Sequence, residues 1–251
     1  MKTPLQRRLY ALTLTALCFF FTCAATASKT VFKLTTEENP PFNFTDEKTG
    51  KFVGIGTEMV KEIFERAHLK YKIVPLPWSR AYNLALQSAN TCVFMTAFTP
   101  ERVSLFKWIG PFTKVEWVVY GKAGTTVKVN SIDDLKSLRV GGYRDDAPVM
   151  FLQKREVKFD LVTSDGLNPR KLKEGRIDVW ITNSTRGPLL AKKQGIEDFT
   201  KLYTIGVINH YLACNKQIEE SAFNALNKAV KEIWSEGLLA KTANRYLHAE
   251  L

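Results

Sequence analysis

Arg102 is the side chain whose place in the sequence points most clearly to chemistry. It ends a Thr-Pro-Glu-Arg turn directly after the apolar run 92–97, and the aromatic residues Phe106 and Trp108 follow it. Most arginines are solvated surface charges. A guanidinium just past the end of a buried strand, however, presents a planar fork of donors that matches a carboxylate. We therefore interpret Arg102 as a candidate binding residue for a small anion.

The side-chain sets that most enzymes need are missing from the sequence. Its three histidines, His68, His210 and His248, fall in different predicted elements, so they indicate neither a metal cluster nor a Ser/His pair. No Gly-rich phosphate loop of the expected form occurs, and most carboxylates fall on predicted helix faces. We predict a protein that is not an enzyme and that carries no metal and no organic cofactor.

Residues 1–27 have the layout of a cleaved signal peptide. Basic side chains come first, an uncharged apolar run follows, and Ala-Thr-Ala ends the segment at residue 27. The alternative is a membrane anchor, because the uncharged run approaches the ~20 residues that a spanning helix needs. We expect cleavage after Ala27 and export of the mature chain.

Two cysteines, Cys92 and Cys214, lie outside this segment. In an oxidising compartment an even number of cysteines favours a disulfide. The alternative is a pair of buried free thiols, because cysteine is among the most buried residue types. The residues alone leave both possibilities open.

The composition is that of an ordinary globular protein. Of 251 residues, 45% are hydrophobic and 24% are charged, and the formal net charge is +11, which excludes a disordered or collagen-like chain. The basic residues are scattered, so we expect no nucleic-acid partner. A generally positive field would instead attract anionic solutes.

Short β-rich runs alternate with amphipathic helical stretches, which predicts an α/β architecture with largely parallel strands. The run 92–97 is almost wholly apolar, as in a strand that is covered on both faces. Two such series, joined by two strand-like crossings, indicate two lobes that face each other across a cleft. The expected strands are 31–36, 71–76, 92–97, 116–120, 139–142, 157–162, 178–182, 202–207 and 211–215, and the expected helices are 56–69, 79–88, 147–155, 164–175, 188–194, 221–234 and 238–246.

An ordered series of segments resembles the bacterial extracellular solute-binding proteins, family 3, which include the periplasmic amino-acid-binding proteins of ABC importers. The resemblance covers essentially the whole chain after residue 27. The segments that carry it are NPPFNF (39–44), GKFVGIGTEMVKEIFERA (50–67), PWSRAYNLALQS (77–88), TPERVSLFKWIGPF (99–112), GRIDVWITN (175–183) and NALNKAVKEIWSEGLLAKTANRYL (224–247).

The resemblance implies the type II periplasmic-binding-protein fold, an α/β clamp of two lobes joined by two hinge strands. Lobe 1 would comprise residues 28–118 and 210–251, and lobe 2 residues 119–209. The implied function is capture of a small solute in the periplasm by a monomer that then meets the permease of an ABC importer. The alternatives are a membrane receptor as the partner, which makes the protein a sensor, and an enzyme on the same fold.

The resemblance also implies the residues of lobe 1 that contact solute. An arginine in the position of Arg102 holds the α-carboxylate of an amino acid. Trp78 and Phe42 fall where relatives place apolar or aromatic walls. Relatives often carry a small hydroxyl residue at the position of Ala97, and Thr96 beside it is the candidate substitute.

In lobe 2 the sequence departs from the family pattern. Relatives carry an aspartate for the solute's ammonium where this chain has Asn183, whose amide supplies no countercharge. A Gly-Thr pair at a helix start is replaced by Asp145 and Asp146, next to Arg144 and Tyr143 in the same turn. These departures weaken the ammonium anchor, and the two aspartates would either take the place of an anion at that helix start or offer an acidic contact to a cationic solute. The resemblance as a whole implies a small, carboxylate-bearing, amino-acid-like polar solute, with contacts from this turn and from Asn183.

The family fold bears on the cysteines as well. It would make the strand that begins at Cys92 and the strand that ends near Cys214 antiparallel neighbours. The resemblance therefore favours a disulfide between them.

Overall fold

A computed structural model describes residues 30–247 of the chain. Its strands are β1 (Val31–Thr36), β2 (Phe44–Thr45), β3 (Phe52–Val53), β4 (Lys70–Pro75), β5 (Thr91–Ala97), β6 (Lys107–Lys122), β7 (Val140–Tyr143), β8 (Phe159–Val162), β9 (Val179–Asn183) and β10 (Phe199–Cys214). Its α-helices are α1 (Ile55–Arg66), α2 (Trp78–Gln87), α3 (Ala147–Gln153), α4 (Asn168–Lys173), α5 (Arg186–Lys192), α6 (Glu220–Ser235) and α7 (Leu238–Leu247), and its 3-10 turns are η1 (Val103–Leu105), η2 (Asp133–Ser137) and η3 (Asp165–Leu167).

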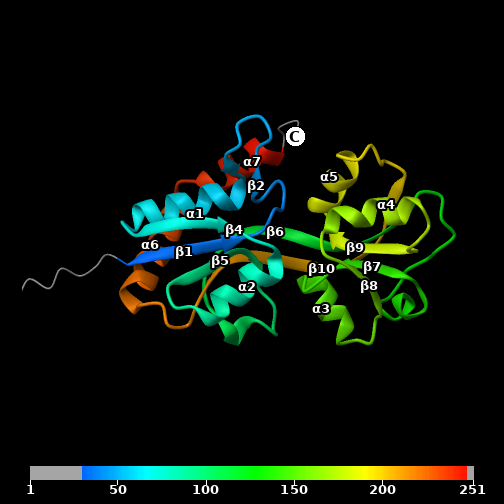
Figure 1. The fold of residues 1–251 in the computed structure, drawn as a ribbon, viewed down its shortest axis with the longest axis horizontal. Helices are drawn as coiled ribbons and strands as arrows, with labels where there is room; N and C mark the ends of the chain where they lie inside the picture. Colours follow the sequence, from blue (N-terminus) through cyan, green and yellow to red (C-terminus); the bar gives the residue numbers. More distant parts are fainter. Residues whose placement is uncertain (1–29, 248–251) are drawn as a thin grey trace, which may run out of the picture.

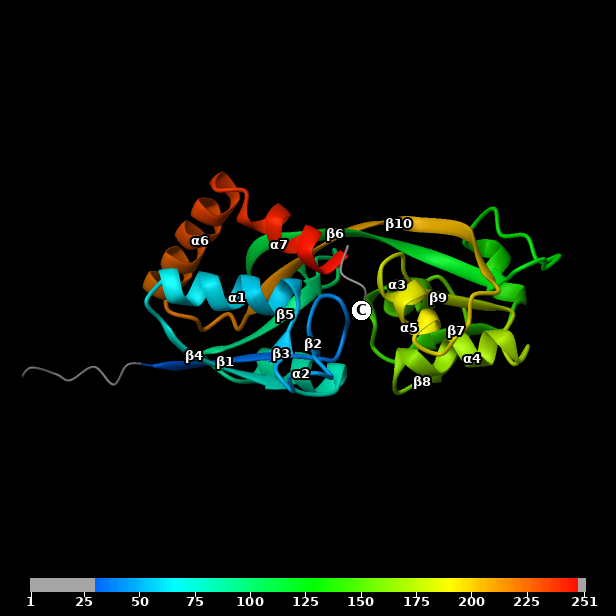
Figure 2. The same ribbon diagram turned by 90° about the horizontal axis from the view of Figure 1, so that it is seen from above.

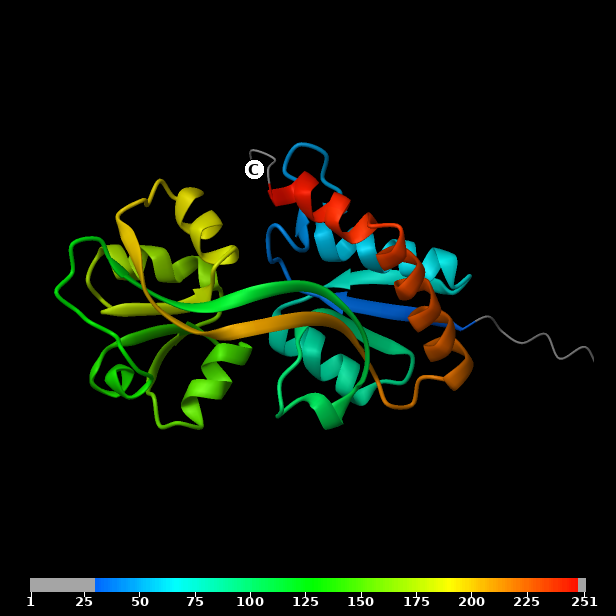
Figure 3. The same cartoon turned by 180° about the vertical axis from the view of Figure 1, so that it is seen from behind.

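One eight-stranded sheet connects the two halves, in the order β4-β1-β5-β10-β6-β9-β7-β8. At one end β1 pairs in parallel with β4 and β5, and at the other β7 pairs in parallel with β8 and β9. Between them β6 and β10 form a long antiparallel pair that passes from one group of helices to the other (Figures 2 and 3). This confirms the two-lobed α/β fold predicted from the sequence.

Helices cover both faces of the sheet in each lobe (Figure 1). In lobe 1, α1 packs with α6 and α7 on one side, and α2 packs on β1 and β5. In lobe 2, α4 and α5 lie on one side of β9 and α3 lies on the other. Because helices cover both faces, β5 is buried at every residue, as its apolar sequence predicts.

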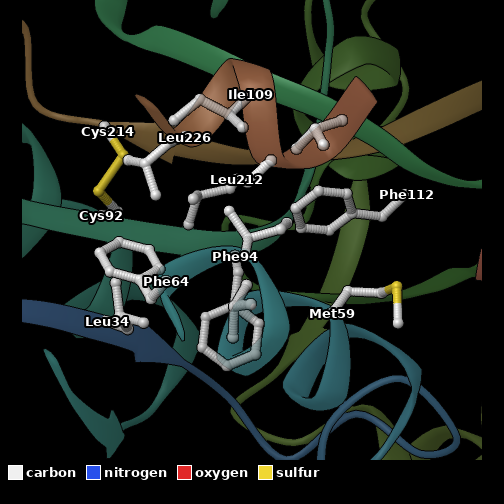
Figure 4. Packing of buried hydrophobic residues seen from close by; sticks show 14 of the residues in the cluster. Leu34, Met59, Phe64, Cys92, Phe94, Ile109, Phe112, Leu212, Cys214 and Leu226 are labelled. Carbon is white, nitrogen blue, oxygen red and sulfur yellow. A yellow bond between two sulfur atoms is a disulfide. The ribbon is translucent and has the colours of Figure 1, made fainter. Parts of the chain in front are cut away.

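The core of lobe 1 joins strands and helices that are distant in sequence. Phe64 of α1 and Leu226 of α6 pack over Leu34 and Phe94 of the sheet, all of them fully buried (Figure 4). Burying one such side chain stabilises the fold by about 1.5–3 kcal/mol. A disulfide joins Cys92 at the start of β5 to Cys214 at the end of β10, and the two cysteines face each other in the antiparallel pair.

The hinge strands are longer than predicted from the sequence. The strand expected over 116–120 is part of β6, which begins at Lys107 and runs through Gly110 and Pro111. The strands expected at 202–207 and 211–215 are one strand, β10. The Gly-Pro pair and the polar residues between the two runs resemble breaks, but β6 and β10 pair across them with register shifts. The proposed lobe boundaries, 118/119 and 209/210, fall inside these two strands.

The expected signal peptide, residues 1–27, and His248 lie outside the described residues. Within residues 30–247, no helix is long and apolar enough to cross a membrane.

Candidate functional site

A polar cavity lies between the lobes at the hinge strands. Its free volume is about 20 Å³, enough for about one water molecule, so the lining side chains close on one another. The lining comprises Glu37, Asn39, Trp78, Met95, Ala97 and Arg102 of lobe 1, Trp117 and His210 of the hinge strands, and Asp146, Pro148, Asn183 and Arg186 of lobe 2.

Arg102 is a buried cation, with 3% of its surface exposed. Its guanidinium lies 5.5 Å from the ring centroid of Trp78 and 4.9 Å from that of Tyr82. Its Nη2 donates to the backbone carbonyl of Asp145, 3.2 Å away. Within the part of the chain that the structure describes, Arg102 forms no ion pair, and burial lowers its pKa. A desolvated guanidinium without a counterion attracts an anion.

The Asp145 loop of lobe 2 meets lobe 1 at this point. The indole Nε1 of Trp78 donates to the Asp145 carbonyl at 2.9 Å, and the hydroxyl of Ser79 donates to the Asp145 carboxylate. Asp145 has a φ of 60°, in the left-handed region that aspartate tolerates better than most residues. The same carbonyl therefore accepts from both Trp78 and Arg102.

Arg186 is the second buried arginine, and two carboxylates form ion pairs with it. Its Nε lies 2.9 Å from Oδ2 of Asp165, and its Nη2 donates to the carboxylate of Asp146. Asp165 also accepts from Nε1 of Trp180 and Oγ1 of Thr182, each at 2.8 Å. Burial lowers the pKa of Arg186, but the carboxylates of Asp146, Asp165 and Glu37 raise it, and the net effect is a raised pKa. This network fixes Asp146 at the edge of the cavity.

Asp146 and Asn183 each accept hydrogen bonds from backbone N–H groups at the start of a helix of lobe 2. Oδ1 of Asp146 accepts from the backbone N–H of Ala147 at the start of α3. Oδ1 of Asn183 accepts from the N–H groups of Thr185 at 3.0 Å and Arg186 at 2.7 Å, at the start of α5. Because both N–H groups need an acceptor, the amide oxygen of Asn183 is occupied, and its NH₂ donor is left for the cavity.

Glu37 and Asn39 were missed by the sequence reasoning. They follow β1, at the carboxyl end of a parallel strand, which is the signal that could have found them. Glu37 is buried, and burial raises the pKa of its carboxyl to about 7 although Arg186 lowers it. Oδ1 of Asn39 is buried without a hydrogen-bond partner.

His210 of β10 faces the cavity as a neutral ring. Burial lowers the pKa of its imidazole to about 4. Its Nδ1 lies 3.1 Å from the hydroxyl of Thr113 on β6, and its ring stands edge-on to Phe42. No group of three His, Cys, Asp or Glu side chains within residues 30–247 could hold a metal ion.

The family model of the bacterial extracellular solute-binding proteins, family 3, matches residues 33–249. The chain belongs to this family. None of the curated proteins matches it.

Solved structures show the same fold. The chain resembles a histidine kinase sensor domain with similarity to periplasmic binding proteins, with a TM-score of 0.79 at 15% identity over 87% of this chain and 96% of that one. A mutant of ArgBP from T. maritima matches with a TM-score of 0.77 at 18% identity, over 87% of this chain and 96% of that one. The substrate binding protein of an amino acid ABC transporter matches with a TM-score of 0.74 at 19% identity, over 86% of this chain and 99% of that one.

Five of the residues selected from the sequence of this family 3 protein line the cavity. They are Trp78, Ala97, Arg102, Asp146 and Asn183. Asp145 adjoins it through its backbone carbonyl.

The structure does not bring the other selected residues into this cavity. Thr96 is fully buried, and its hydroxyl donates to the carbonyl of Val93 in its own strand. Phe42 is buried in the core of lobe 1, behind His210. Arg144 is exposed. Tyr143 lines a neighbouring, more open cleft of about 450 Å³, which shares Glu37 and Arg186 with the cavity.

Proposed function

We propose that this protein captures a small, carboxylate-bearing, amino-acid-like solute between its lobes and delivers it to the permease of an ABC importer. One observation carries the proposal: Arg102 is a buried guanidinium without an ion-pair partner among the described residues, and it points at the opposite lobe. A solute carboxylate in the place of the Asp145 carbonyl would supply the missing charge.

Capture begins in lobe 1, where Arg102 offers two parallel donors and Trp78 an aromatic wall. Lobe 2 then closes by bending β6 and β10, as hinged two-lobed proteins do. Asp146 and Asn183 arrive from lobe 2. The closed state is favoured only by the extra affinity that it has for the solute.

The compartment and the partner follow from the same proposal. The signal peptide expected over residues 1–27 would deliver the chain to the periplasm, where the membrane permease is the docking partner and the protein acts as a monomer. We propose that the protein catalyses no reaction and uses no cofactor. The first experiment is a thermal-shift screen of amino acids, organic acids and small peptides, because a bound solute raises the melting temperature.

Arg102→Ala tests the proposal. We expect it to weaken binding of the carboxylate solute found in the screen by about 10- to 150-fold, because a charge-assisted hydrogen bond contributes roughly 1.5–3 kcal/mol. We expect the melting temperature without solute to change little, because Arg102 has no ion-pair partner to leave exposed. Isothermal titration and thermal melts measure the two quantities.

Arg80→Ala is the matched control, since Arg80 belongs to α2 but is exposed. It should leave binding unchanged. Unchanged affinity in Arg102→Ala, or a large loss of stability without solute, would show that Arg102 is structural and would overturn the proposal.

A sensory role is the second candidate, and the similarity to a histidine kinase sensor domain favours it. The clamp would then dock on a signalling receptor instead of a permease. Copurification of the solute-loaded protein with a permease supports import, and copurification with a receptor supports sensing.

A further inference from the structure

The two buried arginines of the cavity differ in how many carboxylates form ion pairs with them. Arg186 forms ion pairs with two carboxylates, those of Asp146 and Asp165. Arg102 forms an ion pair with none within the described chain, although Asp146, Glu101 and Asp145 act on it from a longer distance. Once a solute carboxylate pairs with Arg102, both arginines are neutralised, and any further carboxylate in the cavity lacks a cation.

Glu37 is that further carboxylate. It is 9% exposed at the end of β1, and among the described residues the strongest cationic influence on its pKa is that of Arg186, which already pairs with two carboxylates. Different elements present the groups that face this region of the cavity. They are Arg186 of α5, Asp146 before α3, Asp165 of η3, Tyr143 of β7 and the neutral His210 of β10.

Asn39 adds an unused acceptor. Its Oδ1 is buried and has no hydrogen-bond partner, although the residue lines the same cavity two positions after Glu37. An orphaned buried acceptor carries an uncompensated desolvation cost, and a donor from a ligand would remove that cost. Glu37 and Asn39 together are suited to bind a group that carries positive charge and several N–H donors.

We propose that Glu37 and Asn39 form the seat of a protonated amine of the solute. This deepens the proposed function and rests on it. Asn183 cannot fill this role, because its amide oxygen is occupied by two backbone N–H groups. The solute is therefore a zwitterion, with its carboxylate on Arg102 and its ammonium on the loop after β1.

The pH dependence of binding follows from the pKa of Glu37, which burial raises to about 7. An ammonium binds the ionised carboxylate, so its affinity should rise between pH 6 and 8 and level off above the pKa of the free protein. His210 does not titrate in this window, because its pKa is about 4. A solute without an amine should show no such rise.

Matched pairs of probes test the seat. Each pair is an L-amino acid and the 2-hydroxy acid of the same side chain: alanine and lactate, leucine and 2-hydroxyisocaproate, phenylalanine and phenyllactate, glutamate and 2-hydroxyglutarate, lysine and 6-amino-2-hydroxyhexanoate. Both members keep the carboxylate, and only the ammonium changes to a hydroxyl. Titrations at pH 6, 7 and 8 use the wild type and the variants Glu37→Gln, Asn39→Ala and Glu38→Gln.

We expect the amino acid of the binding pair to bind at least about tenfold more tightly than its hydroxy acid at pH 8. Glu37→Gln should remove most of this preference and its pH dependence, and Asn39→Ala should remove part of it. Both should weaken binding of the hydroxy acid less than binding of the amino acid, because a hydroxyl can still donate a hydrogen bond but carries no charge. Glu38→Gln is the matched control, because Glu38 is exposed and its carboxylate bonds Thr45, so it should behave as the wild type.

Equal affinity for both members of a pair, with binding still dependent on Arg102, would overturn the seat and leave the proposed function standing. An amine preference that survives in Glu37→Gln would also overturn it. Binding of no probe by the wild type would overturn the proposed function together with the seat. If Glu37→Gln does not fold, Asn39→Ala and the wild-type pH series decide.

Discussion

At the scale of single residues, two buried arginines show how partners decide chemistry. Arg102 and Arg186 line one cavity at 3% and 4% exposure. Carboxylates on both sides commit Arg186 to the protein's own structure. Arg102 has aromatic rings beside it, and among the described residues it donates to the Asp145 carbonyl and lies near the sulfur of Met150 but has no carboxylate partner, so its charge remains available to a solute.

Asn183→Asp is the prediction at this scale. One oxygen of the new carboxylate would keep the bonds to Thr185 and Arg186, and the other would replace the NH₂ group with a negative acceptor. We expect α-amino acids to bind about tenfold more tightly, measured by isothermal titration, and hydroxy acids to gain nothing.

Asn183→Ala is the contrasting variant for this position. It removes the acceptor at the start of α5 and should lower the free energy of unfolding by about 1 kcal/mol. If no amino acid titrates differently in Asn183→Asp, the end of β9 does not contact the solute.

At the scale of elements, lobe 2 presents a rigid wall. Arg186 at the start of α5 links η3, through Asp165, to the loop before α3, through Asp146. Three short elements therefore depend on one guanidinium. Removing one partner of a buried ion pair is costly, because the remaining charges stay desolvated.

Arg186→Met is the prediction for these elements. It keeps a long side chain but leaves Asp165 and Asp146 without their cation, so we expect the free energy of unfolding to fall by about 3–5 kcal/mol. Urea denaturation measures it. The control is Arg139→Met, which removes the ion pair with Asp178. Because the side chain of Arg139 is 60% exposed, we expect the free energy of unfolding to change by no more than about 1 kcal/mol. Equal effects of the two substitutions would contradict the role of the network.

At the scale of the whole molecule, the antiparallel pair of β6 and β10 makes one sheet of two lobes. The lobes meet again at polar contacts beside the cavity and at ion pairs outside its lining. Lys193 of lobe 2 pairs with Glu47 of lobe 1, and Lys154 of lobe 2 lies 3.7 Å from Glu101 of lobe 1. Contacts of this exposed kind are weak, which suits a clamp that must reopen.

The disulfide gives the prediction for the whole chain. It joins residues separated by 122 positions and lies fully buried in lobe 1. A crosslink over so long a loop restricts the unfolded chain, so reduction should lower the free energy of unfolding by about 2–5 kcal/mol. Urea unfolding with and without reductant measures it. The double variant Cys92→Ala, Cys214→Ala should unfold identically in both conditions, and a wild type equally insensitive to reductant would refute the prediction.

The sequence by itself determined the features that depend on near neighbours. Helical spacing of apolar residues predicted α1, an unbroken apolar run predicted β5, and a turn after a buried strand singled out Arg102. These signals act within a few residues, so no partner strand is needed to read them. The ends of β6 and β10 were misjudged because long-range pairing carries both strands across residues that would break an isolated strand.

Only the tertiary structure decided how charge is shared in the site. Glu37, Arg102 and Arg186 come from separate parts of the chain, and the folding of two lobes around shared strands brings them to one cavity. Distances between residues far apart in sequence decide three things. They decide which arginine pairs with carboxylates, which carboxylate has no ion-pair partner, and whether the oxygen or the NH₂ group of Asn183 is available to a solute. Charges interact through space with a strength set by separation and burial, and neither quantity is written in the order of the residues.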